Sequence, residues 1–369
     1  MSRITLENLT KRFKETTVLD GINLEVPEGT TLVLFGSSGA GKTVLLRCIA
    51  GAIEPDNGRI LIGGSDFTDV PPEERGIGMA FQNFALFPHM SAFDNIATPL
   101  TARTLEKSAI QKAVDGVSRL LKIEHVLSHK PKALSNGQKQ RTALARALVS
   151  EPKVLLLDDP LRNVDAKLRF EMRLELPRLL ADRGATVIYV TQDYKEAMAL
   201  GDRIAVLEAG RITQIGTPED IYRRPANIDI AKLFGDPTIN LLDVIPQRDA
   251  SGVFATLSDQ RIPLDDGYTE FVGEDCVLGL RPEALSFAES SKAVPVTVEA
   301  ETPFNEKTVT LVTTLRKREI LLSRPAGTPA PSSGSARMAI DPRGAILFDR
   351  ASGNRIDPKS TASAEEAAA

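Results

Sequence analysis

The chain has 369 residues, of which 42% are hydrophobic and 25% charged, and its formal net charge is −4. These values fit a globular protein of two domains and argue against a nucleic-acid binder that relies on a broad basic surface. No apolar run approaches the roughly 18 residues that span a bilayer, the N-terminus lacks an apolar signal core, and Cys48 and Cys276 lie far apart. We therefore expect reduced, cytosolic thiols, and any membrane role through a partner.

The first segment, residues 3–35, alternates apolar and polar positions and predicts antiparallel strands. Its last part, Thr30–Phe35, is an apolar run that predicts a buried strand. Phe13 lies ahead of this strand and has two interpretations, because an aromatic ring here serves either as a core residue or as a platform for the flat face of a purine.

A glycine-rich loop that ends in Gly-Lys-Thr follows the buried strand and precedes Val44–Ala50, the predicted first turns of a helix. The backbone N–H groups of such a loop and the helix N-terminus point at one concavity, which favours a phosphate group. Lys42 would reach the β- and γ-phosphates, and the Thr43 hydroxyl would complete a Mg²⁺ shell. The predicted phosphate cradle consists of Gly36, Ser37, Ser38, Gly39, Ala40, Gly41, Lys42 and Thr43.

Two short strands are predicted beyond this helix, Arg59–Ile62 and Ile77–Gln82, and the second ends in a polar residue. From about residue 91 to 134 apolar positions recur at helical spacing, which predicts a helical insertion between two parts of an α/β core. Ser135 is a suitable N-cap for a helix predicted over Lys139–Val149. The N-terminus of that helix is a second place that favours an anion.

Two further apolar runs, Val154–Asp158 and Thr186–Val190, predict buried parallel strands. The first is followed by a second carboxylate, Asp159, and the second leads to Gln192. Strands that alternate with helices predict a mostly parallel sheet with its ligand at the carboxyl edge. The remaining elements predicted for this core are helices over Ala166–Leu180 and Tyr194–Leu200, a strand over Arg203–Glu208 and a hairpin turn at Ala209-Gly210.

The pattern changes around Phe234–Pro237. From about residue 240 to 350, short apolar alternations separated by Pro and Gly turns predict a small all-β domain, a sandwich or a barrel. The last stretch, residues 351–369, is rich in Ala, Ser and Glu with little to bury, and predicts a disordered tail.

Several motifs stand in one order: the glycine-rich loop, Phe81-Gln82, the run Leu134-Ser135-Asn136-Gly137-Gln138, and the strand that ends in Asp158. In this order they resemble the ATP-binding subunits of ABC transporters, and the resemblance covers most of residues 3–245. Three further motifs are similar to the branch that drives bacterial import of sugars, polyols and glycerol phosphates, which includes the maltose importers. They are Phe87-Pro88-His89-Met90, Gly216-Thr217-Pro218-Glu219 and Leu280-Arg281-Pro282-Glu283.

The resemblance implies a division of the chain. Residues 1–238 would form an α/β P-loop (RecA-like) ABC ATPase domain, with a helical subdomain at about 88–152. Residues 239–350 would form an all-β, OB-like regulatory domain. This division agrees with the change of pattern near Phe234–Pro237.

The same resemblance implies ATP and Mg²⁺ as ligands. Phe13 matches the aromatic residue that stacks on adenine. Asp158 matches the carboxylate that coordinates Mg²⁺ beside Thr43, and Gln82 matches the glutamine that contacts Mg²⁺ and senses the membrane subunits.

The resemblance further implies a dimer with two composite sites. Asp165 matches the aspartate of the loop that crosses the dimer interface. The signature loop would cap the ATP held by the opposite monomer, and it comprises Ser135, Asn136, Gly137 and Gln138.

Four positions depart from the family pattern. Asp159 stands where the family has the Glu that polarises the attacking water, and Gln192 stands where the family has its switch His. Asp159 is one methylene shorter, and a set-back of more than about 1 Å can cost on the order of 10²-fold in rate. Gln192 can donate a hydrogen bond but carries no positive charge and relays no proton. Arg162 replaces a Ser, and Asn136 replaces a Gly.

These departures predict intact ATP binding and weakened hydrolysis. The chain is then either a slower ATPase that works as a homodimer or one half of a heterodimer whose other subunit hydrolyses ATP. Its expected partners are transmembrane permease subunits, a second ATP-binding subunit and, indirectly, a solute-binding protein, at the cytoplasmic face of the inner membrane. Phe84–Pro88, an apolar stretch beside Gln82, is the predicted dock for a permease, with simple packing as the other interpretation.

Other functions remain open alternatives. An exporter subunit or a DNA-repair or chromosome-structure ATPase shares the nucleotide core, but the latter needs a long coiled coil or a basic surface. A third alternative makes residues 240–350 the main functional part, as a module that binds a signalling protein or a small solute. The transported solute is set by other subunits and is not predicted.

Overall fold

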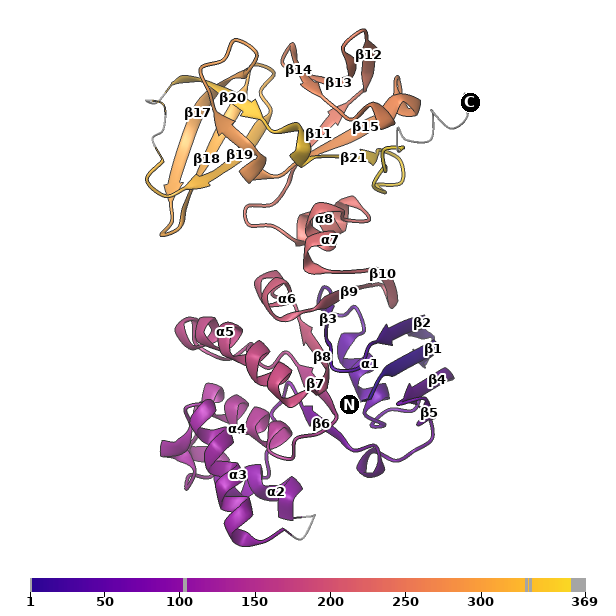
Figure 1. The fold of residues 1–369 in the computed structure, drawn as a ribbon, viewed down its shortest axis with the longest axis vertical. Helices are drawn as coiled ribbons and strands as arrows, with labels where there is room; N and C mark the ends of the chain where they lie inside the picture. Colours follow the sequence, from indigo (N-terminus) through magenta and orange to yellow (C-terminus); the bar gives the residue numbers. More distant parts are fainter. Residues whose placement is uncertain (1, 102–104, 329–330, 332–333, 360–369) are drawn as a thin grey trace. The chain divides into compact units, whose positions relative to one another are not determined.

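The computed structural model describes residues 2–101, 105–328, 331 and 334–359. The chain forms two compact units, Met1–Pro218 and Glu219–Ala369, which are described here one at a time (Figure 1). None of the helices in the described residues is long and apolar enough to cross a membrane.

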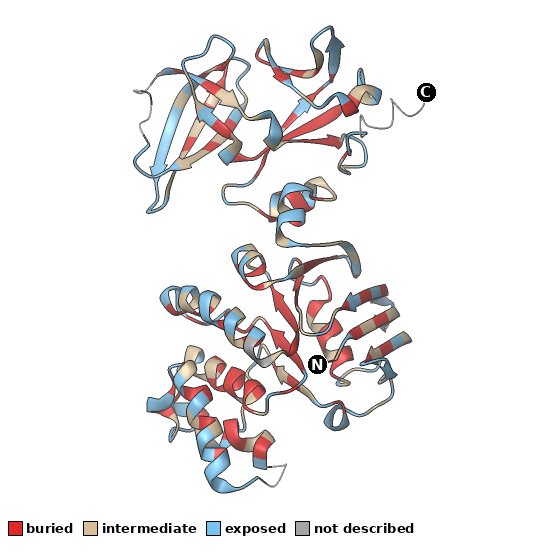
Figure 2. Ribbon diagram, viewed as in Figure 1, coloured by how far each residue is buried: buried red, intermediate tan, exposed pale blue. Residues whose placement is uncertain are grey.

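The first unit is built on a six-stranded sheet with the order β10-β9-β3-β8-β7-β6. Every neighbouring pair is parallel except β9 and β10, which form a hairpin. All residues of β3, β7 and β8 are buried, as expected for central parallel strands, and Figure 2 shows these strands as the buried centre of the unit. The predicted mostly parallel sheet is therefore confirmed. Its strands are β3 (Thr31–Phe35), β6 (Ile77–Ala80), β7 (Val154–Asp158), β8 (Thr186–Thr191), β9 (Arg203–Glu208) and β10 (Arg211–Gly216).

A second, antiparallel sheet has the order β2-β1-β4-β5. Its inward side chains share one apolar core with helix α1 and with β3, β7, β8 and β9 of the central sheet. The segment 3–35 thus divides between the two sheets. The mostly apolar β3 is buried on both faces, whereas β1 and β2, whose polarity alternates, are buried on one face. The bounds are β1 (Ile4–Phe13), β2 (Thr16–Val26), α1 (Lys42–Ile49), β4 (Asn57–Ile62) and β5 (Ser65–Asp66).

The helical insertion is present in the described residues, and its last helix begins earlier than predicted. The Ser135 hydroxyl accepts the backbone N–H of Gln138, and the Gln138 side chain accepts the backbone N–H of Ser135. This capping box starts the helix at Asn136 instead of Lys139. The helices of this unit are α2 (Ala92–Thr101), α3 (Lys107–Leu120), α4 (Asn136–Leu148), α5 (Ala166–Arg183) and α6 (Tyr194–Leu200), with short 3₁₀ turns over Pro72–Glu74, Glu124–Val126 and Pro131–Ala133.

The second unit is rich in β-strands, as predicted, and its pairings are antiparallel. Three sheets have the orders β11-β15-β21, β12-β13-β14 and β16-β20-β17-β18-β19, and they pack around one apolar core. The strands are β11 (Asn240–Val244), β12 (Gln247–Asp249), β13 (Gly252–Leu257), β14 (Gln260–Pro263), β15 (Cys276–Leu280), β16 (Leu285–Phe287), β17 (Val294–Pro303), β18 (Lys307–Thr314), β19 (Glu319–Pro325), β20 (Ser335–Ile340) and β21 (Ala345–Asp349), with 3₁₀ turns over Asp266–Phe271, Pro282–Ala284 and Pro342–Gly344.

The second unit begins about twenty residues earlier than the predicted boundary at 238/239, because it includes helices α7 (Pro218–Arg223) and α8 (Ile228–Leu233). Arg281, which is 5% exposed, holds them to the strands. Its guanidinium donates to the backbone carbonyls of Tyr222 (2.7 Å), Ala231 (2.9 Å) and Phe234, and it stacks 4.0 Å from the Tyr222 ring. Within the Arg281-Pro282-Glu283 motif, the buried Arg281 therefore joins the two helices to the strands of this unit.

The predicted tail is wrong for residues 351–359, which pack on the second unit. Ile356 is 6% exposed within the apolar core, and Asn354 and Arg355 form isolated β-bridges with Asn227 and Phe348. One apolar side chain and a few backbone hydrogen bonds hold this stretch, and neither changes the amino-acid composition enough to predict order. Residues 360–369 lie outside the described part of the chain.

Candidate functional site

The phosphate loop connects the buried strand β3 to helix α1. Lys42 is 6% exposed, and its ammonium donates to the carbonyls of Gly36 and Ser37, both at 2.7 Å. Gly36 is required here because a Cβ would lie 2.3 Å from the Leu207 carbonyl oxygen. Gly41 is the N-cap of α1 and has a φ of 105°, in the region that favours glycine. The loop thus curls tightly around the lysine, as a phosphate cradle requires.

The carboxyl ends of β3, β7 and β8 meet at one cavity of about 210 Å³. This edge of a parallel sheet is where such folds bind ligands. The structure brings together nine of the predicted site residues here, although they come from segments far apart in the chain. The lining is Val18, Ser38, Gly39, Gly41, Lys42, Thr43, Val44, Gln82, Asp158, Asp159, Arg162, Val190 and Gln192.

Thr43 and Asp158 form the oxygen-rich part of this cavity. The Thr43 hydroxyl donates to the Asp158 carboxylate at 3.2 Å, and Gln82 lies on the same lining. Burial raises the pKa of Asp158 above its ordinary value, against the lowering effect of the Thr43 hydrogen bond. A hydroxyl, an amide and a carboxylate are hard oxygen donors of the kind that Mg²⁺ binds alongside phosphate oxygens, so these residues fit the metal that the sequence predicts.

Asp159 follows β7 with a φ of 49°, an uncommon backbone conformation for a residue other than glycine. Its N–H donates to the Val190 carbonyl (3.0 Å), and its carbonyl accepts from the Arg162 N–H (3.3 Å) and from Gln140 Nε2 (2.8 Å). The side chain is 13% exposed, and one carboxylate oxygen lies 3.7 Å from a guanidinium nitrogen of Arg162. Burial raises the pKa of Asp159, while the Arg162 charge opposes that rise. The carboxylate is thus held at the cavity despite its short side chain.

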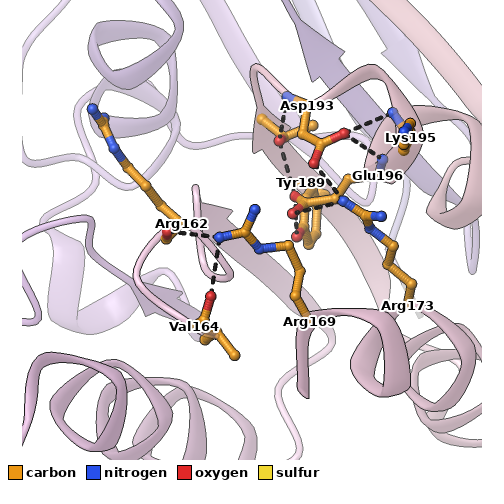
Figure 3. A network of polar contacts seen from close by, with 9 residues as sticks. Arg162, Val164, Arg169, Arg173, Tyr189, Asp193, Lys195 and Glu196 are labelled. Atoms are coloured by element: carbon orange, nitrogen blue, oxygen red, sulfur yellow. Dashed lines mark hydrogen bonds and ion pairs between the residues drawn. The ribbon is translucent and has the colours of Figure 1, made fainter. Parts of the chain in front are cut away.

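Gln192 is exposed on the cavity lining, and a buried polar network holds the turn that follows it (Figure 3). Glu196, 2% exposed, accepts from the hydroxyls of Tyr189 and Thr191, both at 2.9 Å. Arg173 on α5 pairs with Asp193 and approaches Glu196 to 3.9 Å. Burial raises the pKa of Glu196. The segment that carries Gln192 is therefore fixed between β8, α6 and α5.

Gln140 is a buried residue that the sequence analysis missed. It is 4% exposed, donates to the Asp159 carbonyl and accepts the Asn163 N–H, both at 2.8 Å. The amide thereby ties helix α4, which begins with the signature loop, to the loop that carries Asp159. A signal was present in the sequence, since Gln140 is a polar residue at helical spacing from the buried Ala143, Leu144 and Ala147.

The other predicted site residues lie outside the cavity lining. Phe13 ends β1 with 44% of its surface exposed, and the Lys11 ammonium lies 5.5 Å from its ring centre, so it is not a core residue. Asp165 caps α5 by accepting the Leu168 N–H at 3.0 Å. The signature residues Ser135, Asn136, Gly137 and Gln138 form the first turn of α4 and its cap. Gly36, Ser37 and Ala40 contribute backbone to the loop around Lys42.

A parallel sheet with a phosphate loop, a strand-end carboxylate pair and an inserted helical segment defines an ATPase cassette of the P-loop class. The family model described as "ABC transporter" matches residues 19–162. The sn-glycerol-3-phosphate import ATP-binding protein UgpC of Yersinia pseudotuberculosis is 39% identical over 363 residues, 97% of this chain and 100% of that protein. The maltose/maltodextrin import ATP-binding protein MalK of Yersinia pestis is 44% identical over 304 residues, 82% of each chain.

Solved structures agree with these relatives. The ATP-binding cassette MJ0796, solved as a dimer in a post-hydrolysis state bound to ADP and Pi, has a TM-score of 0.55 and 30% identity to this chain. The match covers 58% of this chain and 98% of that cassette. The chain belongs to the ABC transporter family of ATP-binding proteins.

Proposed function

We propose that this chain is the ATP-binding subunit of an importer and couples ATP hydrolysis to the uptake of a sugar, polyol or glycerol-phosphate-type solute. The observation that carries the proposal is the match along 97% of the chain to a glycerol-phosphate import subunit, which includes the β-rich second unit. An exporter subunit or an ATPase outside transport would not account for that part of the match. The import subunits among its relatives therefore favour import over both alternatives.

The chemistry follows from the cavity lining. Lys42 and the N–H groups at the start of α1 bind the phosphates of ATP. Thr43, Gln82 and Asp158 would hold Mg²⁺, and the bound ion would supply positive charge to the phosphate oxygens. Asp159 orients and polarises the attacking water, and positioning of this kind supplies most of the catalysis in phosphoryl transfer.

The site has a shorter base than its family and no switch histidine, so its hydrolysis is weak. We infer that the chain works as one half of a heterodimer, in which its own ATP serves for binding and closure. Its signature loop, Ser135–Gln138, then completes the hydrolytic site of a different subunit that has Glu and His at the positions of Asp159 and Gln192. A slower homodimer is the competing arrangement.

ATP turnover distinguishes these arrangements. The chain is purified alone and with the products of neighbouring genes, and phosphate release is measured for each preparation. We expect little turnover alone and full turnover with a second ATPase subunit. Robust turnover by the isolated chain that Asp159→Asn abolishes would contradict the heterodimer, and absence of nucleotide-dependent uptake in vesicles with the permease would contradict the importer itself.

An apolar groove of about 590 Å³ on the first unit is the proposed dock for the transmembrane permease. Its lining combines Phe81, Ala85 and the 41% exposed Phe87 with residues of β6 and of the turn that follows α1. Arg146 shapes it by donating to the carbonyls of Phe84 (3.1 Å) and Ala85 (2.8 Å). Docking here would place the chain as a peripheral subunit on the cytoplasmic face of the inner membrane, in indirect contact with a solute-binding protein.

Co-purification tests this dock. Phe87→Ala should reduce recovery of the chain with permease subunits and leave nucleotide binding unchanged. Leu174→Ala, a matched control at a side chain 59% exposed on α5, should affect neither. Equal recovery of both variants with the permease would place the dock elsewhere.

A further inference from the structure

Arg162 is a cation of the nucleotide cavity that belongs neither to the phosphate loop nor to the proposed metal site. It lies in the loop between β7 and α5 and shares the cavity with Lys42, Gln82, Asp159 and Gln192. Its backbone is anchored at both ends, because its N–H donates to the Asp159 carbonyl (3.3 Å) and its carbonyl accepts from Arg169 Nη2 (3.1 Å). The loop thus holds the residue in place while leaving the side chain to face the cavity.

The guanidinium itself is loosely held. The side chain is 53% exposed, and Figure 3 shows it directed away from the Arg169 and Arg173 side chains. Within the described part of the chain its ion pair is with Asp159, at 3.7 Å, which is longer than a hydrogen bond. A guanidinium has five donors in a planar fork that matches the geometry of a phosphate group, and this pairing satisfies none of them closely.

The charge of the cavity favours a second protein cation, even with a Mg²⁺ ion counted at Thr43, Gln82 and Asp158. Its lining carries two carboxylates, Asp158 and Asp159, and two cations, Lys42 and Arg162. ATP brings about four further negative charges, of which the terminal phosphate carries the most. Gln192, on the same lining, carries no charge. Without Arg162, Lys42 would be the single protein cation of this lining among the described residues.

We propose that Arg162 is a nucleotide-binding residue whose guanidinium leaves its loose pairing with Asp159 and binds the terminal phosphate of ATP, so that the subunit distinguishes ATP from ADP. The proposal rests on the proposed function, since it takes ATP as the ligand of this cavity. Release of Asp159 would at the same time free its carboxylate to face the attacking water. Arg162, in the loop after β7, would thereby supply a positive charge to the terminal phosphate. Gln192, at the end of β8, cannot supply that charge.

Nucleotide discrimination tests this role. Affinities of the full-length chain for the magnesium complexes of ADP and of the non-hydrolysable β,γ-imido analogue of ATP are measured by calorimetry. Arg162→Ser should weaken binding of the analogue about tenfold or more, as expected for loss of a charge-assisted phosphate contact, and change ADP affinity less than twofold. Arg162→Lys should restore part of the difference because it keeps the charge. Arg178→Ser, an exposed arginine of α5, is the matched control and should change neither affinity.

The possible failures are separable. Equal weakening of both nucleotides by Arg162→Ser, or no weakening of either, overturns the assignment of Arg162 while the importer function stands. If the wild-type chain binds neither nucleotide, and Lys42→Ala behaves identically, the proposed function fails together with the inference. The far-UV circular dichroism of the Arg162 and Arg178 variants should match that of the wild type, because both side chains are exposed. The same measurement checks the fold of Lys42→Ala, whose side chain is buried.

Discussion

The buried amide of Gln140 offers a direct test of how the signature helix is coupled to the catalytic loop. Gln140→Met keeps the shape and removes both hydrogen bonds, to the Asp159 carbonyl and from the Asn163 N–H, each 2.8 Å long. Each bond contributes about 1 kcal/mol net, and a buried group left without a partner costs about 1–3 kcal/mol. Asn163 is exposed and water can replace its lost partner, whereas Asp159 is only partly exposed. The expected loss of unfolding free energy is therefore about 2 kcal/mol.

Urea unfolding followed by circular dichroism measures the global loss, and hydrogen exchange of residues 159–164 measures the local loss. Gln111→Met is the matched control, because Gln111 makes its amide hydrogen bond to Asp115 on the exposed surface of α3. That variant should lose no more than about 0.5 kcal/mol. If Gln140→Met proves as mild as Gln111→Met, and exchange in the loop is unchanged, Gln140 does not hold the catalytic loop and the reasoning from its burial is refuted.

Three further predictions concern buried groups. Burial raises the pKa of both Cys48 and Cys276 to about 11, so neither thiol should react with a disulfide reagent at pH 8 in the native chain. In denaturant, two equivalents of reagent should react. Fast labelling of the native chain would contradict this prediction. Arg281→Met should destabilise the second unit by about 3 kcal/mol or more in thermal or urea unfolding, because three carbonyls lose their donor, whereas the exposed Arg343→Met should have little effect. Burial raises the pKa of Glu196 in the folded state above its ordinary value of 4.5, so the folded chain binds the carboxyl proton more tightly than the unfolded chain. The free energy of unfolding should therefore fall as the pH rises from 4.5 through the pKa of the folded state. Glu196→Gln should remove this contribution to the pH dependence of stability, as measured by urea unfolding at several pH values.

The parts of the fold that sequence predicts best are those with continuous apolar runs. β3, β7 and β8 are buried on both faces, so each carries a nearly continuous apolar run and its limits are sharp. Because these strands are parallel neighbours, the polar residues that follow their carboxyl ends lie at the same edge of the sheet. This is why the sequence alone indicates that Lys42 and Asp159 lie at one edge of the sheet, and the structure has both on one cavity lining.

The parts that were missed depend on contacts distant in sequence. Helices α7 and α8 have six residues each, too few for a clear period, and belong to the second unit because Arg281, about fifty residues later, binds their carbonyls. Ile356 anchors residues that looked like a polar tail. Glu196 resembles a surface residue in the sequence, and its burial follows from a tyrosine and a threonine of the neighbouring strand. Such tertiary partners leave no local periodic signal.

The backbone conformation at Asp159 limits how well a longer side chain can restore ATP hydrolysis at this position. Its φ of 49° lies in the left-handed region, where Asp and Asn occur several-fold more often than other non-glycine residues. The bonds to Val190, Arg162 and Gln140 fix that conformation, so a longer residue must adopt it too. Asp159→Glu should therefore bring its carboxylate closer to the water and raise ATP turnover. The loss of stability should stay below the roughly 1–2 kcal/mol that the left-handed region costs an ordinary residue, because Asp159 already meets part of that cost. If the variant loses stability without gaining turnover, the length of this side chain is not what weakens hydrolysis. The missing switch histidine at Gln192 would then be the remaining explanation.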